Sequence, residues 1–98
     1  MTEYRVTYWE DIPSMVSAKA GRQRAKVELA PRFGVAIDEL AMRLGMTGTD
    51  AYLQAWRRTP WEKREGSPDE VAAAVAAELE AAYPPERVRA ILDAANDS

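Results

Sequence analysis

The sequence predicts an α+β fold, in which an N-terminal three-stranded antiparallel meander is followed by about four helices. Two observations support this prediction. In the first 29 residues apolar side chains tend to recur at every second position, the period of a half-buried strand, whereas from residue 31 they recur every three or four positions, the period of a helix. In addition, turn-forming residues separate the short strand-like runs, so hairpins are the simplest connections between them.

The predicted strands alternate between two faces, and the first is rich in β-branched and aromatic residues. We expect this first strand to end before Pro13, because proline cannot donate to a sheet ladder. Gly21 marks a turn between the second and third strands, and Lys26 and Glu28 are predicted to point outward from the third. The strands are expected over residues 3–9 (EYRVTYW), 15–20 (MVSAKA) and 25–29 (AKVEL).

The predicted helices begin and end at clear sequence signals. The first starts at Pro31, which suits a first-turn position, and stops before Gly45. The third follows the capping box SPDE, in which Ser67 and Glu70 can each bond to the other's backbone. Residues 59–66 are expected to form a polar connector. The helices are expected over residues 31–44, over 49–58, from 67 to the Pro84–Pro85 pair, and from that pair onward.

The charge is distributed unevenly along this chain of 98 residues, whose net charge is −3. Residues 1–65 hold eleven Lys and Arg against nine Asp and Glu, whereas residues 66–98 hold two against seven. We therefore expect a domain over residues 1–65 and an acidic helical extension over residues 66–98 that packs on or near it. An acidic segment more commonly solvates a protein or binds a basic partner than it contacts phosphate.

The chain contains no Cys and no His, which removes disulfides, thiolate nucleophiles, histidine relays and the usual zinc sites. The remaining acidic and hydroxyl residues form no constellation for catalysis, and no glycine-rich loop has the spacing of a phosphate cradle. We predict that the protein is not an enzyme and uses no cofactor or metal. With no membrane-spanning apolar run and no export signal, the expected location is cytoplasmic.

Three basic residues alternate through the stretch GRQRAKVELAPRF: Arg22, Arg24 and Lys26. A basic strand followed by two helices resembles the ribbon–helix–helix repressors, obligate dimers whose strand side chains enter the major groove of DNA. Glu28 shares the basic face, however, and phosphate would repel it. A hairpin edge whose charges prevent edge-to-edge pairing explains the same residues. We favour the hairpin and keep the DNA-binding dimer, which would use residues 22–26, as the alternative.

The aromatic residues could stack on bases or a small ring, but packing within a small domain explains most of them. Trp9 is the exception, because it falls on the opposite face of the first strand from Tyr4 and Val6, beside a turn. We expect it to be exposed there and to anchor a partner. The predicted partner-binding residues are therefore Trp9, Arg22, Arg24 and Lys26.

Several separated motifs, in the order YRVTYWEDIP, AKVELAPRF, AIDELAMRLGMTGTDAYL and WRR, resemble a small bacterial family, the virulence factor domain. This domain also resembles an inner segment of the conserved virulence factor C proteins of staphylococci. The resemblance covers residues 4–58 and does not include the acidic segment from residue 66 onward. Because it runs through the first strand as well as the third, it favours a sheet with a basic hairpin over a lone DNA-reading strand.

The resemblance implies an interaction module, since the family has no established activity. In the staphylococcal proteins the segment is joined to a domain similar to the N-terminal part of iron–sulfur scaffold proteins and to helical repeats. Stand-alone members are associated with one-carbon genes, including ones similar to methylenetetrahydrofolate reductase and corrinoid methyl transfer. We therefore expect a non-catalytic accessory subunit that docks on a larger cytoplasmic protein, with a one-carbon or redox enzyme as the first candidate. We expect no nucleic-acid or membrane partner.

Overall fold

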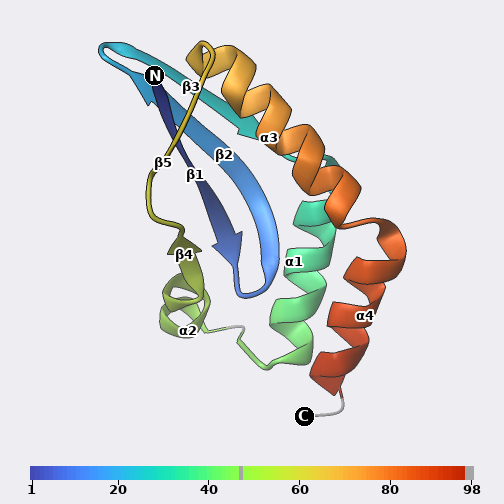
Figure 1. The fold of residues 1–98 in the computed structure, drawn as a ribbon. Helices are drawn as coiled ribbons and strands as arrows, with labels where there is room; N and C mark the ends of the chain where they lie inside the picture. Colours follow the sequence, from blue (N-terminus) through green and yellow to red (C-terminus); the bar gives the residue numbers. More distant parts are fainter. Residues whose placement is uncertain (47, 97–98) are drawn as a thin grey trace.

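The computed structural model describes residues 1–46 and 48–96, and it confirms the α+β fold (Figure 1). In this part of the chain an antiparallel sheet, built on an N-terminal meander, is joined to four helices, as the change of hydrophobic period predicted. The strands are β1 (Thr2–Trp9), β2 (Ile12–Ala20), β3 (Gln23–Glu28), β4 (Trp56–Arg58) and β5 (Glu62–Arg64). The helices are α1 (Pro31–Arg43), α2 (Thr49–Gln54), α3 (Pro68–Ala82) and α4 (Pro85–Asn96).

The strands are ordered β3-β2-β1-β4, and β5 also pairs with β1. Two short strands therefore share the outer side of β1: β4 pairs with residues 7–9 and β5 with residues 2–4. Thr59 bridges the interval between them, because its N–H donates to Val6 O (3.0 Å) and its hydroxyl accepts from Val6 N (2.9 Å). As a result β1 is an interior strand, whereas β3 forms an edge of the sheet.

Two of the predicted elements are wrong. The second helix ends at Gln54 instead of residue 58, and Trp56–Arg58 form β4. The expected connector over residues 59–66 contains β5. One cause explains both differences. Without β4 and β5, the outer side of β1 would leave a row of backbone N–H and C=O groups unpaired, and pairing them outweighs the weak helical preference of this segment.

The first strand ends before Pro13, as expected, but the second begins at Ile12 instead of residue 15, so Pro13 lies within β2. The register between β1 and β2 shifts between Thr7 and Tyr8, so Pro13 faces Tyr8 at the irregular end of the ladder. Proline is tolerated at such irregularities, where the regular hydrogen bonding is already interrupted. Gly21 occupies the predicted turn with a φ of 59°, a left-handed conformation that favours glycine.

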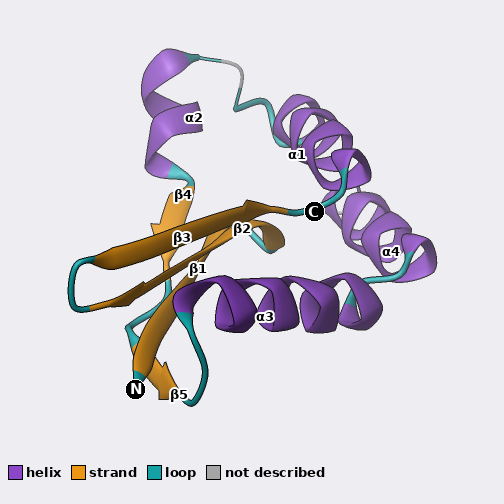
Figure 2. Cartoon of the chain, turned by 90° about the horizontal axis from the view of Figure 1, so that it is seen from above, coloured by secondary structure: helices purple, strands orange, loops and turns teal. Residues whose placement is uncertain are grey.

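A hydrophobic core lies between one face of the sheet and the helices. α3 runs along β2 and β3, and α1 and α4 pack side by side (Figures 1 and 2). Residues 66–98, expected as an extension packed on or near the first 65 residues, supply α3 and α4 to this shared core; residues 97 and 98 lie outside the described part. The larger buried side chains include Trp9, Ile12, Val16, Phe33, Ile37, Leu40, Val71 and Leu92.

The predicted capping box is confirmed at the start of α3. Ser67 Oγ accepts from Glu70 N, and Glu70 Oε1 accepts from Ser67 N, both at 3.2 Å. The bond from the Ser67 N–H, with a smaller contribution from its hydroxyl, lowers the pKa of Glu70. At the other end of α3, Arg32 donates to the carbonyl oxygens of Glu80 (3.1 Å) and Tyr83 (2.7 Å), which the helix end leaves unpaired. None of the described helices has the length and apolarity needed to cross a membrane.

Candidate binding surface on the open face of the sheet

The register of the strands sorts their side chains into two faces, because residues paired directly across a ladder point to the same side. On one face Val6, Val16 and Val27 form an apolar row on the side of the core. The other face, which we call the open face, carries three rows of mostly charged residues. These rows are Arg24–Lys19–Glu3–Lys63, Lys26–Ser17–Arg5 and Glu28–Met15–Thr7–Arg58.

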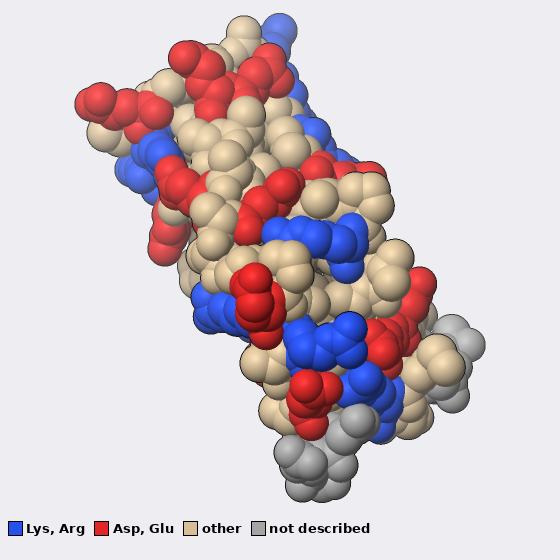
Figure 3. Space-filling view, turned by 90° about the vertical axis from the view of Figure 1, so that its right-hand side faces the viewer, with Lys and Arg blue, Asp and Glu red and all other residues tan. Residues whose placement is uncertain are grey.

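The open face is basic although the chain as a whole is acidic. Its rows contain six Lys and Arg residues against two Glu, whereas the net charge of the chain is −3. Within the described part none of these six cations forms an ion pair; the ion pairs are made by Arg43 and Arg64 elsewhere. The helical side, by contrast, carries acidic and basic side chains intermixed (Figure 3). Unpaired positive charge gathered on one face attracts anions.

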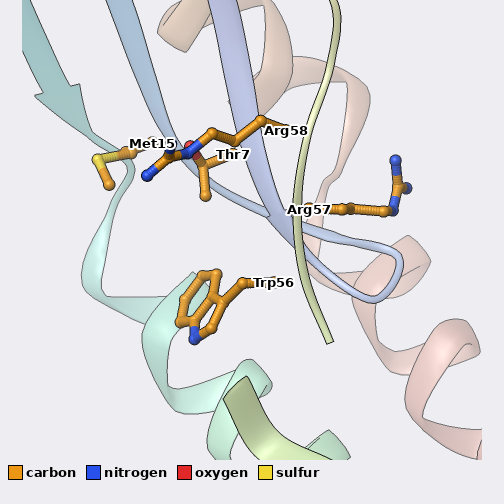
Figure 4. Close-up of a pocket in the computed structure, with 5 residues that line it drawn as sticks. All are labelled: Thr7, Met15, Trp56, Arg57 and Arg58. Atoms are coloured by element: carbon orange, nitrogen blue, oxygen red, sulfur yellow. The ribbon is translucent and has the colours of Figure 1, made fainter. Parts of the chain in front are cut away.

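Two adjoining shallow hollows open on this face. The first, of about 460 Å³, lies between Trp56 on β4 and Met15 on β2 (Figure 4). In this view Arg58 reaches across Thr7 toward Met15, and Arg57 points away. The second hollow, of about 350 Å³, is lined by residues of the basic rows. Three residues line both hollows, which therefore form one continuous groove: Thr7, Met15 and Arg58.

Trp61 lies beside the second hollow and positions two of the cations. Arg5 Cζ is 4.3 Å and Lys19 Nζ 4.2 Å from the centre of a Trp61 ring, which is cation–π distance. The Nε atom of Arg5 is buried without a hydrogen-bond partner among the described residues. A guanidinium has five N–H donors, and a carboxylate in the groove would pair with those that remain accessible. Arg5 therefore presents to the groove a cation that lies at cation–π distance from Trp61.

Two of the predicted partner-binding residues, Arg24 and Lys26, are exposed on the open face. Arg22 is exposed as well, in the turn that precedes β3. Glu28 shares the face with Arg24 and Lys26, as expected from the alternation. Their positions bring two of the three basic residues into the groove, and their role in binding stays a prediction.

The expectation that Trp9 is exposed is wrong. Its side chain is 0 % exposed, its Nε1 donates to Tyr52 O at 3.0 Å, and its ring centre lies 5.4 Å from that of Tyr52. The pairing of Trp9 with Trp56 in β4, which follows directly after α2, brings that helix against it. A side chain without exposed surface cannot anchor a partner, so Trp9 belongs to the core.

Sequence reasoning missed four of the six cations of the open face and two aromatic residues that line the groove: Arg5, Lys19, Arg58, Lys63, Trp56 and Trp61. A signal existed for the first two, because strand alternation already placed Arg5 opposite Tyr4 and Val6, and Lys19 opposite Ala18. No such signal existed for the other four. Their positions depend on β4, where the sequence predicted a helix, and on β5 with the segment that leads into it, where the sequence predicted a connector.

A further hollow, of about 360 Å³, lies between β1 and α3 and contains two tyrosines. The hydrogen bond from Tyr4 Oη to Glu62 Oε2 (2.7 Å) raises the pKa of Tyr4, and burial raises the pKa of Tyr8. Both phenols therefore stay protonated at neutral pH and serve as donors, not as bases. Among the described residues there is no group of three or more Asp and Glu that could hold a metal ion.

Comparison with known proteins adds one finding. A family model described as "Virulence factor" matches residues 7–92, most of the chain. The match extends well past residues 4–58, where the motifs lie, and it includes α3 and most of α4, the helices that complete the core. No curated protein and no solved structure matches the chain. Because the family model spans nearly the whole fold, the chain belongs to the virulence factor family.

Proposed function

We propose that this protein is a non-catalytic binding module whose open face docks on an acidic surface of a larger protein. The observation that carries the proposal is the concentration, on one face of a protein whose net charge is negative, of six cations that have no ion-pair partner among the described residues. Such an asymmetric field orients the molecule toward an acidic partner and speeds association. Trp56, partly exposed beside the groove, supplies aromatic contact of the kind that dominates interface energetics.

A protein partner is favoured over nucleic acid for two reasons. Trp61 already stacks with Arg5 and Lys19, which limits the ring surface left for a base. Moreover, β3 pairs with β2 of its own chain, whereas the reading strands of ribbon–helix–helix proteins pair between two chains. We therefore propose an accessory role, with a one-carbon or redox enzyme, named by the family resemblance, as the first candidate partner.

Charge reversal on the open face tests this proposal. Arg24→Glu and Lys26→Glu alter exposed side chains of β3. Arg89→Glu on α4 is the matched control, because it makes the same change of charge at an exposed position away from the open face. Tagged protein captures partners from a nuclease-treated extract of a bacterium that encodes it, and calorimetry on the purified partner then gives the Kd. We expect each β3 variant to bind about tenfold more weakly and Arg89→Glu to bind like the wild type.

Three outcomes would contradict the proposal. Unchanged affinity of Arg24→Glu and Lys26→Glu would remove the open face as the docking surface. Salt-sensitive binding to a single-stranded oligonucleotide, lost in the same two variants, would assign the face to nucleic acid. Substrate turnover by the purified chain alone would contradict a non-catalytic role. The one-carbon enzyme is tested directly by mixing the two purified proteins and measuring their combined mass by light scattering.

A further inference from the structure

The edge strand β3 offers a regular backbone ladder to a partner. The sheet ends at β3 on one side, and no described segment pairs with its outer side. The register between β2 and β3 is continuous over six residue pairs, without a bulge. The opposite side of the meander differs, because β1 is covered by β4, β5 and the Thr59 bridge. An uncovered and regular edge of this kind is a template for an added strand whose charges suit it.

The two faces of β3 carry different side chains, basic on one and apolar on the other, and this difference restricts which sequences can pair as an added strand. Arg24 and Lys26 point to the open face and are exposed, and Arg22 stands in the turn just before them. Ala25 and Val27 point to the other face and are only half-buried, although α3 lies against β3 there. A strand laid beside β3 would therefore meet cations on one face and a partly covered apolar surface on the other.

A second copy of this chain fits that edge poorly. Pairing two β3 strands antiparallel about Ala25 would place Arg24 of one copy beside Lys26 of the other on the open face, and like charges on neighbouring strands are destabilising. A segment with Glu or Asp at alternate positions would instead place carboxylates beside Arg24 and Lys26. Its intervening apolar residues would extend the row that ends at Val27.

We infer that β3 accepts an extended segment of a partner protein, alternating acidic and apolar residues, as an additional strand of the sheet. The inference rests on the proposed function and specifies its geometry: the partner's backbone bonds to the outer side of β3, and its carboxylates enter the open face. Main-chain bonds then provide affinity, and the alternating side chains provide specificity.

Two synthetic peptides separate strand addition from simple attraction to the basic face. The first is a capped peptide of alternating Glu and Val. The second has the same sequence, with N-methyl groups on one Glu and the adjacent Val at its centre. The methyl groups remove backbone donors on both edges of the peptide without changing its charge. Fluorescence anisotropy of labelled peptides measures the Kd, and hydrogen exchange of the intact protein reports on the amides of β3.

We expect the plain peptide to bind, N-methylation to weaken binding about tenfold or more, and exchange to slow at the outward amides of β3. Lys26→Glu should weaken binding of the plain peptide, and Arg89→Glu should not. Equal affinity for both peptides, each weakened by Lys26→Glu, would refute strand addition and leave the docking function intact. Peptide binding that Lys26→Glu and Arg89→Glu affect equally, or no binding at all, would count against both the inference and the proposed function.

Discussion

Replacing Trp9 tests whether its role is structural. The side chain is fully buried, lies against Tyr52 and donates its indole N–H to the Tyr52 carbonyl. Truncating a buried tryptophan to alanine typically costs about 3–5 kcal/mol, because transfer free energy is lost and a cavity remains. Domains of this size are stable by roughly 5–15 kcal/mol, so Trp9→Ala removes a large part of the free energy of unfolding. Trp9→Phe keeps a ring but loses the indole hydrogen bond, which alone is worth about 1 kcal/mol.

Urea denaturation followed by circular dichroism measures this effect. With an m-value of about 2 kcal/mol per molar, a loss of about 4 kcal/mol lowers the urea midpoint by about 2 M. Trp61→Ala is the control, because Trp61 is partly exposed and its loss removes mainly cation–π contacts worth about 0.5–1 kcal/mol each. The assignment of Trp9 to the core is refuted if Trp9→Ala shifts the midpoint no further than Trp61→Ala does.

Four other predictions concern the core, the cap of α3 and the open face. Leu40 on α1 is 3 % exposed, so Leu40→Ala should lower the free energy of unfolding by about 2–5 kcal/mol. An unchanged melting temperature would show that Leu40 is not part of the core. Ser67→Ala should cost about 1 kcal/mol by urea denaturation, since it removes the N-cap of α3. Because the folded state lowers the pKa of Glu70 below its ordinary 4.5, the contribution of that carboxylate is present above pH 4.5 and is lost as the pH falls through the lower folded value. The urea midpoint should therefore depend less on pH, between neutral and about pH 3, in Glu70→Gln than in the wild type. Finally, the affinity for an acidic partner should fall as salt rises, because the screening length shortens from about 10 Å at 0.1 M to about 3 Å at 1 M, and a salt-independent Kd measured by calorimetry would contradict electrostatic docking.

The local pattern was sufficient to predict the meander and most helix boundaries, because those signals are contained in consecutive residues. The alternation of β1 and the stripe on α1 each repeat several times, and Ser67 with Glu70 forms a self-contained cap. The pairing of β4 and β5 with β1 could not be predicted in this way. Each is three residues long, too short to display a period, and each exists because a strand that lies 47 to 62 residues earlier in the chain needs a partner.

The same distinction between local and tertiary signals applies to the residues of the candidate surface. Alternation placed Arg24, Lys26 and Glu28 on one face of β3, and the register confirms this. The wrong prediction at Trp9 has a tertiary cause. Alternation predicted the face of β1 on which Trp9 lies, but only the fold shows that α2 and β4 cover the end of β1. Burial at the end of a strand depends on what the rest of the chain places there, which a local pattern does not contain.

Two roles predicted from the sequence for the same residues have one physical basis on the open face. Basic residues on an edge strand were expected to prevent pairing between copies, and they were also expected to contact a protein partner. Arg24 and Lys26 do not need to be assigned to one role, because the same positive field acts on whichever strand approaches β3. It repels a strand that carries the same charges, as a second copy would, and it attracts one that carries carboxylates. Protection of the edge against self-association and selection of an acidic partner are therefore two consequences of a single charge pattern.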